Sequence, residues 1–273
     1  MIPAPFDYVR AGSAEEAVAL LVEHGDEAKL LAGGHSLLPL MKLRLAIPSV
    51  LIDVGRVHEL SFIEEQGDEV AIGALTRHHD LETSSLLKEQ VPMLPYTAHQ
   101  VGDPQVRHRG TLGGSLAHGD PASDLPAAIL ALGGTLVAQG PGGRREIAAV
   151  DFFKGFLETA LAPDEMLVEI RVPKTPGAGW SFQKFNRRAQ DWAIVGVAAV
   201  VNGTTGIALV NMGSTPLRAT AVEAAVGGGA SVADAALLAA EGADPPSDIN
   251  ASSEYRRHLA TVLVRRALEE ATS

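Results

Sequence analysis

The chain has 273 residues, 46% of them hydrophobic and 20% charged, and its formal net charge is −11. This length predicts two or three domains, and the negative charge argues against nucleic-acid binding, which needs a basic face. The chain has no cysteine, which excludes disulfides and cysteine-ligated iron–sulfur clusters within it. The first residues lack the pattern of a signal peptide, and no apolar run reaches the roughly 18 residues of a membrane span, so we expect a cytoplasmic protein.

Helix and strand patterns alternate through the N-terminal half of the chain. Ser13 to Glu16 has the form of a capping box, and the apolar positions behind it predict a helix that ends at Gly25. Further helices are predicted from Thr76 and over residues 91–101 and 122–132. Strand patterns cover residues 28–31, 50–54, 70–74 and 166–172, and a hairpin is predicted over 135–147. This alternation is typical of an α/β layer.

The clearest domain boundary is the proline- and glycine-rich segment from Pro173 to Gly179. Beyond it, helices are predicted over residues 218–226, 232–241 and 254–270, and strands over 180–186 and 207–212, while residues 193–201 fit either type. This order of helix and strand patterns predicts an α+β domain with an antiparallel sheet. We therefore divide the chain into residues 1–176, with subdomains of about 1–55 and 56–176, and residues 177–273.

Two glycine-rich stretches carry the strongest functional signal. The first, over residues 32–36, reads Ala-Gly-Gly-His-Ser and follows a buried strand; the second covers residues 110–118 and contains another Gly-Gly pair. Glycine lets the backbone approach a ligand, and successive free N–H groups in such a turn bind anions. Neither stretch fits the P-loop or Rossmann fingerprints, and a single Gly-Gly pair is commonly only a turn. Together they predict that both loops grip one phosphate-containing cofactor.

Other polar side chains give weaker signals. His118, Asp120 and Asp124 lack the spacing of metal ligands, so no metal site is predicted. The serines beside the glycine pairs do not lie in a Gly-x-Ser-x-Gly elbow, so no catalytic residue is predicted in this chain. His78 is expected at the surface of its helix. Lys184, on an alternating strand, is either a solvated residue or a cation beside the cofactor.

Four segments together resemble the FAD-binding medium subunits of the molybdenum hydroxylases. They cover residues 32–44, 109–124, 184–195 and 211–219, in the order and at the spacing of that family. The family includes the medium subunit of aerobic carbon monoxide dehydrogenase and the FAD-binding subunit of xanthine dehydrogenase. The resemblance spans nearly the whole chain. It implies an α+β fold in which a two-subdomain FAD-binding module of the vanillyl-alcohol-oxidase type precedes a small α+β flavoprotein domain with an antiparallel sheet.

The resemblance also implies which residues hold FAD. The first stretch would wrap the diphosphate with backbone amides and comprises Leu31, Ala32, Gly33, Gly34, His35 and Ser36, flanked by Leu37. The second would meet phosphate and ribityl oxygens with amides and hydroxyls and comprises Thr111, Leu112, Gly113, Gly114 and Ser115. Single residues would complete the site: Val101 packing on the cofactor, Asp124 accepting from an FAD hydroxyl, Leu167 contacting the rings, Lys184 near the flavin, and Trp192 beside the isoalloxazine, where many relatives carry tyrosine.

The family implies that the chain acts inside a larger complex. Substrate oxidation would occur at a molybdopterin cofactor on a large subunit. Electrons would pass through [2Fe–2S] clusters on a small subunit to this FAD and then to an external acceptor. A dimer of heterotrimers is expected, with membrane contact only through the electron acceptor. The substrate stays open between carbon monoxide, an aldehyde, a purine and an N-heterocycle.

Two alternatives remain open. A stand-alone FAD-dependent oxidase of the same superfamily would need its own substrate pocket and usually a larger C-terminal domain than the residues after Pro173 form. A non-catalytic binding module that has lost FAD is disfavoured by the two intact glycine pairs.

Overall fold

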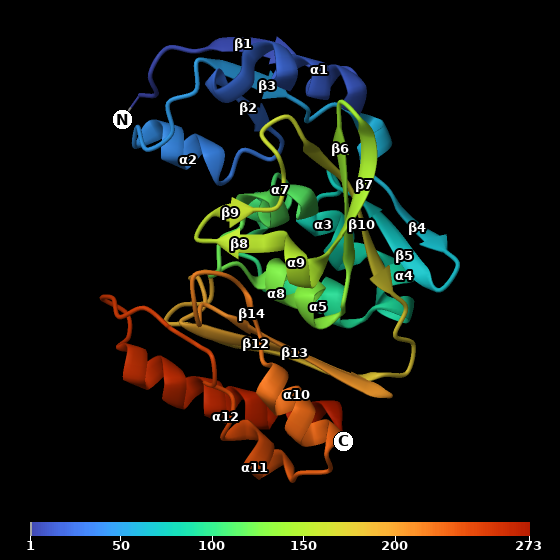
Figure 1. Cartoon of the computed structure of the whole chain (residues 1–273), viewed down its shortest axis with the longest axis vertical. Coiled ribbons are helices and arrows are strands. Elements are labelled where there is room, and N and C mark those ends of the chain that lie inside the picture. Colours follow the sequence, from blue (N-terminus) through green and yellow to red (C-terminus); the bar gives the residue numbers. More distant parts are fainter. Residues whose placement is uncertain (1) are drawn as a thin grey trace.

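The computed structural model describes residues 2–273, which form three blocks stacked along the long axis of the molecule (Figure 1). Each block is built on its own sheet, with the N-terminal block at one end and the C-terminal block at the other. No helix among the described residues is long and apolar enough to cross a membrane.

The N-terminal block is a three-stranded parallel sheet in the order β1–β3–β2. Its elements are β1 (Asp7–Arg10), α1 (Ala14–His24), β2 (Ala28–Leu31), α2 (Leu37–Lys42) and β3 (Val50–Asp53). Ser13 caps the helix as predicted, because its hydroxyl accepts from the Glu16 N–H at 3.1 Å. The reciprocal bond of a capping box is displaced by one residue, because the Glu16 carboxylate accepts from the Gly12 N–H at 2.6 Å and not from that of Ser13. Strand β2 lies at the sheet edge, so the first glycine stretch leaves it with no neighbouring strand on its outer side.

The middle block is a five-stranded antiparallel sheet in the order β4–β5–β10–β6–β7. Its strands are β4 (Ile63–Gln66), β5 (Glu69–Gly73), β6 (Thr135–Gly140), β7 (Gly143–Ala148) and β10 (Met166–Pro173). Side chains along β6 alternate between two faces, and a register shift between Leu167 and Glu169 changes the alternation along β10. Val137 and Val168 pack into the core around α1, whereas Leu136 and Ile170 pack into the core on the opposite face. The sheet therefore joins the N-terminal block to the helices on its other side.

Those helices surround α8 (Asp124–Ala131), all of whose residues are buried. The others are α3 (His78–Thr83), α4 (Ser85–Gln90), α5 (Met93–His99), α6 (Pro104–Arg107), α7 (Leu112–His118) and α9 (Ala149–Phe152), with a small hairpin of β8 (Phe153–Gly155) and β9 (Glu158–Thr159). An apolar run buried on every side is typical of a core helix. Helix α8 has this position because the C-terminal block covers the side that the middle block leaves open.

The C-terminal block contains a four-stranded sheet in the order β11–β12–β13–β14, which is antiparallel as predicted from the sequence. Its elements are β11 (Gly179–Phe185), β12 (Val195–Asn202), β13 (Thr204–Val210), β14 (Leu217–Arg218), α10 (Thr220–Gly227), α11 (Val232–Ala236) and α12 (Ser253–Ala271). The segment over 193–201 that fitted either type is thus mainly strand. A side chain at Gly206 would clash with the Ala131 carbonyl at the end of α8, so the sheet approaches this helix closely.

Some predictions of local structure are wrong. Residues 112–118, expected as a loop, form α7, whose N-terminus is capped by Thr111. His78, expected at the surface, is only 3% exposed. Strands β1 and β4 were not predicted, because both are edge strands with mostly exposed residues and no apolar alternation. The predicted helix over 232–241 is regular only in α11, which ends at Ala236.

Candidate functional site

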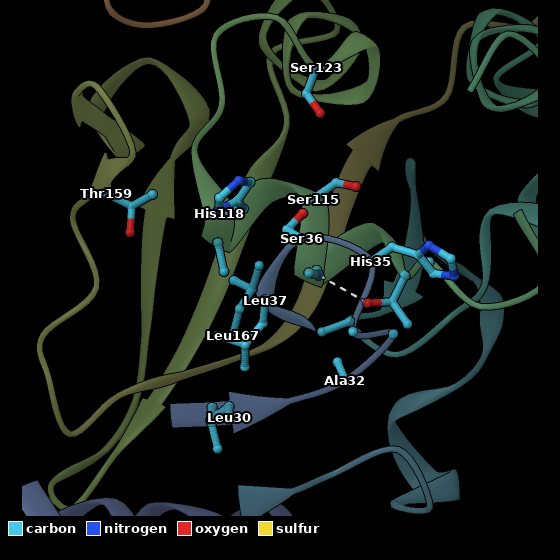
Figure 2. Close-up of a pocket in the computed structure, with 18 of the residues that line it drawn as sticks. Leu30, Ala32, His35, Ser36, Leu37, Ser115, His118, Ser123, Thr159 and Leu167 are labelled. Atoms are coloured by element: carbon cyan, nitrogen blue, oxygen red, sulfur yellow. Dashed lines mark hydrogen bonds between the residues drawn. The ribbon is translucent and has the colours of Figure 1, made fainter. Parts of the chain in front are cut away.

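Most of the predicted site residues line one cavity of about 790 Å³, at the place where the three blocks come together. Figure 2 shows His35, Ser36 and Leu37 of the first stretch beside Ser115 and His118 of α7. Every predicted site residue lines this cavity except Leu31 and Leu112. Leu112 belongs instead to the hydrophobic core of the middle block.

The first glycine stretch presents an unusual run of free backbone donors. Among the hydrogen bonds of residues 2–273, none is donated by a backbone N–H of residues 32–37. Gly34 has a φ of +77°, and a Cβ at Gly33 would lie 2.9 Å from the Cα of Gly110. Glycine is therefore needed at Gly34 for conformation and at Gly33 for the close approach of the second stretch. A run of free amides in such a turn is an anion-binding concavity.

The second stretch differs from the first because its amides from Leu112 to Ser115 already have acceptors. The N–H of Leu112 donates to Thr76 at 3.0 Å and that of Gly113 donates to Ala74 at 2.8 Å. The amides of Gly114 and Ser115 donate to the Thr111 hydroxyl and carbonyl, each at 3.1 Å. The stretch therefore offers a ligand its side-chain hydroxyls rather than the amides of residues 112–115.

A buried ion pair joins two blocks at the edge of the cavity. The Lys184 ammonium on β11 donates to the Asp124 carboxylate on α8 at 2.7 Å and to the Gln100 carbonyl at 3.0 Å. Both charged side chains are 6% exposed, so the interpretation of Lys184 as a solvated strand residue is wrong. Burial raises the pKa of Asp124 to about 6, against the opposing effect of the ammonium. The second carboxylate oxygen, Oδ1, is buried without a hydrogen-bond partner.

His78 is a site residue that sequence reasoning missed. Its Nε2 lies 3.0 Å from the Thr111 carbonyl oxygen and 3.1 Å from the Ser115 hydroxyl, and its Nδ1 is buried without a partner. Burial lowers the pKa of His78 to about 4, so the imidazole is neutral at neutral pH. No local pattern marks this histidine, because its contacts come from a segment more than thirty positions further along the chain.

The segment from Leu157 through β9 to the start of β10 also lines the cavity, and only Leu167 in it was predicted. It turns at Leu157, which has a φ of +58°, and is held by Glu165. The Glu165 carboxylate pairs with Arg145 at 2.6 Å and accepts from the Ala162 N–H at 2.7 Å. Figure 2 shows Thr159 of this segment across the cavity from Ser115. Within residues 2–273, no cluster of three or more His, Cys, Asp or Glu is placed to hold a metal ion.

The cavity suits a dinucleotide with a diphosphate and a flat ring system. The free amides of residues 32–37 match the charge of a diphosphate. The unpartnered oxygen of Asp124 is an acceptor for a ligand hydroxyl, since a buried polar atom without a partner is costly. Leu37, Leu161 and Leu167 supply apolar lining. The residues present therefore fit FAD.

Comparison with known proteins agrees with this chemistry. Residues 4–175 match the FAD binding domain in molybdopterin dehydrogenase, and residues 180–271 match the CO dehydrogenase flavoprotein C-terminal domain. The chain belongs to this family of FAD-binding dehydrogenase subunits. It is 44% identical to the carbon monoxide dehydrogenase medium chain of Hydrogenophaga pseudoflava over 282 residues, covering 99% of this chain and 98% of the relative.

Solved structures of family members share the whole fold. A chain of carbon monoxide dehydrogenase from Hydrogenophaga pseudoflava is similar with a TM-score of 0.96 and 46% identity, covering 100% of this chain and 99% of that one. A chain of quinoline 2-oxidoreductase from Pseudomonas putida 86 has a TM-score of 0.93 and 34% identity, with the same coverage. The predicted family, fold class, FAD cofactor and oxidoreductase class are confirmed.

Proposed function

We propose that this chain is the FAD-carrying electron-transfer subunit of a molybdenum hydroxylase. It would accept electrons from [2Fe–2S] clusters on a small partner subunit and pass them to an external acceptor. The substrate would be oxidised at a molybdopterin cofactor on a large subunit, in a dimer of heterotrimers located in the cytoplasm. The full-length likeness to a carbon monoxide dehydrogenase medium chain supports this division of labour.

The residues of the cavity have distinct roles in the proposal. The amides of residues 32–37 bind the FAD diphosphate, and the free oxygen of Asp124 accepts from a hydroxyl. Leu37, Leu167 and Trp192 flank the ring system and limit the access of water. Bound FAD supplies a carrier that can take up and release electrons, and the protein sets its position and electrostatic surroundings. We place the domain boundary at residues 176 and 177, between the two matched ranges.

The run of free amides in the first stretch is the observation that carries the proposal, because it gives the cavity a site for a diphosphate. The test is anaerobic mixing of the FAD-loaded chain with a chemically reduced [2Fe–2S] subunit, following the flavin absorbance. Loss of the oxidised flavin spectrum, and its return when an acceptor is added, is expected. The same chain without FAD is the control. Reduction of the lone chain by a small organic substrate would instead support a stand-alone oxidase.

A further inference from the structure

His78 connects α3 to both glycine stretches. Its backbone N–H donates to the Gly110 carbonyl at 3.0 Å, and a Cβ on Gly110 would lie 2.8 Å from the ring carbon Cε1 of His78. Gly110 in turn lies against Gly33 of the first stretch. The imidazole thus packs on the second glycine stretch, which in turn packs on the first stretch with its free amides. Through Nε2 it also contacts Ser115 of α7 and the residue that caps this helix.

The contacts of Nε2 decide which ring nitrogen carries the proton. The Thr111 carbonyl oxygen, 3.0 Å away, can only accept, so a deprotonated Nε2 would place two lone pairs against each other. A proton on Nδ1 would also leave a buried donor without an acceptor, since that atom has no partner. The favoured tautomer therefore has Nε2–H and a bare Nδ1.

This tautomer has a consequence for Ser115. Its hydroxyl oxygen lies 3.1 Å from Nε2 and accepts from the same N–H, so the hydroxyl proton is not used by His78. Ser115 lines the cavity, and Figure 2 shows its side chain there near Ser36. The proton is thus available to an oxygen of a ligand in the cavity. In the opposite tautomer, the hydroxyl would donate to Nε2 and would be lost to the ligand.

We propose that His78 is a positioning residue of the cofactor site, which holds Ser115 as a hydrogen-bond donor to a phosphate or ribityl oxygen of FAD. This inference rests on the proposed function and adds to it a residue outside both glycine stretches. Burial lowers the pKa of His78, so the imidazole is neutral at neutral pH and carries a single proton, which the contacts of Nε2 place on that nitrogen.

The test is a double-mutant cycle on FAD affinity in the full chain, measured by calorimetry with His78→Leu, Ser115→Ala and the double variant. Each single variant is expected to weaken binding roughly tenfold, as for loss of one hydrogen bond to a charged or polar ligand. If His78 acts through Ser115, the double variant binds within about threefold of Ser115→Ala. Additive losses would overturn the proposal. His79→Leu, at the exposed neighbouring histidine, is the matched control and should bind as wild type does.

Two further measurements keep the test decisive if His78→Leu does not fold. The side-chain amide of His78→Gln reaches the place of Nε2 and should restore most of the affinity, whereas His78→Asn places its amide near Nδ1 and should not. Nitrogen-15 spectra of the histidine-labelled chain, recorded without FAD, should show Nε2 as the protonated nitrogen. Equal affinity of the Gln and Asn variants, or a proton on Nδ1, would refute the positioning role. A wild-type chain that binds no FAD would overturn the proposed function as well.

Discussion

Removal of the Lys184 ammonium should make the stability of this chain strongly dependent on pH. The Lys184→Met variant keeps most of the apolar stem but leaves the Asp124 carboxyl buried without its cation. Among the described residues, Lys184 is the one charged group that lowers the pKa of Asp124, so no second cation compensates for its loss. A carboxyl in this position has to keep a proton or ionise without compensation.

The magnitude follows from the pKa of Asp124, which is about 6 in the fold against an ordinary value of 3.8. One pKa unit corresponds to about 1.4 kcal/mol, so ionisation in the wild-type fold costs about 3 kcal/mol of stability. The folded state holds the proton more tightly, so this cost develops as the pH rises from 3.8 to about 6 and is constant above. In Lys184→Met, burial still raises the pKa of Asp124, while the charge and the hydrogen bond of the ammonium no longer lower it. The stability of this variant therefore continues to fall above pH 6.

Urea unfolding at pH 5 and pH 8 measures the effect. Relative to wild type, the destabilisation of Lys184→Met should grow by about 2–3 kcal/mol between these pH values. Lys174→Met is the matched control, because Lys174 also bonds one carboxylate, Glu65, at 3.1 Å and one carbonyl, Gly67, at 2.7 Å. Glu65 is well exposed, so that variant should lose less than about 1 kcal/mol at either pH. A destabilisation of Lys184→Met that is equal at pH 5 and pH 8 would refute the reasoning.

Three other predictions concern the cavity. A Cβ at Gly33 would lie 2.9 Å from a Cα of the second stretch, so Gly33→Ala should weaken FAD binding about tenfold or more in a fluorescence titration. Gly142→Ala, with nothing within 4 Å, should not. Trp192 lines the cavity and is 58% exposed, so FAD should slow its oxidation by N-bromosuccinimide severalfold while that of Trp180 stays unchanged, as read by mass spectrometry. Between pH 6.5 and pH 4, wild type should lose about 3 kcal/mol relative to His78→Gln in urea unfolding, because the unfolded chain protonates first.

The parts of the site that could be predicted are those whose chemistry is local in the sequence. The first glycine stretch follows a short strand and leads into a helix, and both elements are visible in the order of residue types. Lys184 and Asp124 were each predicted singly from the family, but their ion pair joins residues sixty positions apart and depends on how β11 meets α8. His78 escaped prediction for the same reason, since a histidine on a short helix has no periodicity that reveals a buried partner.

The two Gly-Gly pairs show that the same dipeptide can have different structural roles in one chain. Gly34 takes a left-handed conformation ahead of α2, and the backbone donors around it stay free. Gly113, in the first turn of α7, lies against Ala74, the residue that follows β5: a Cβ at Gly113 would lie 2.6 Å from the Ala74 side chain, and its amide donates to the Ala74 carbonyl. Whether a glycine stretch binds an anion thus depends on which carbonyls the rest of the fold brings to it. In this chain the first pair supplies free amides, while the second supplies close packing that brings the Ser115 hydroxyl to the cavity.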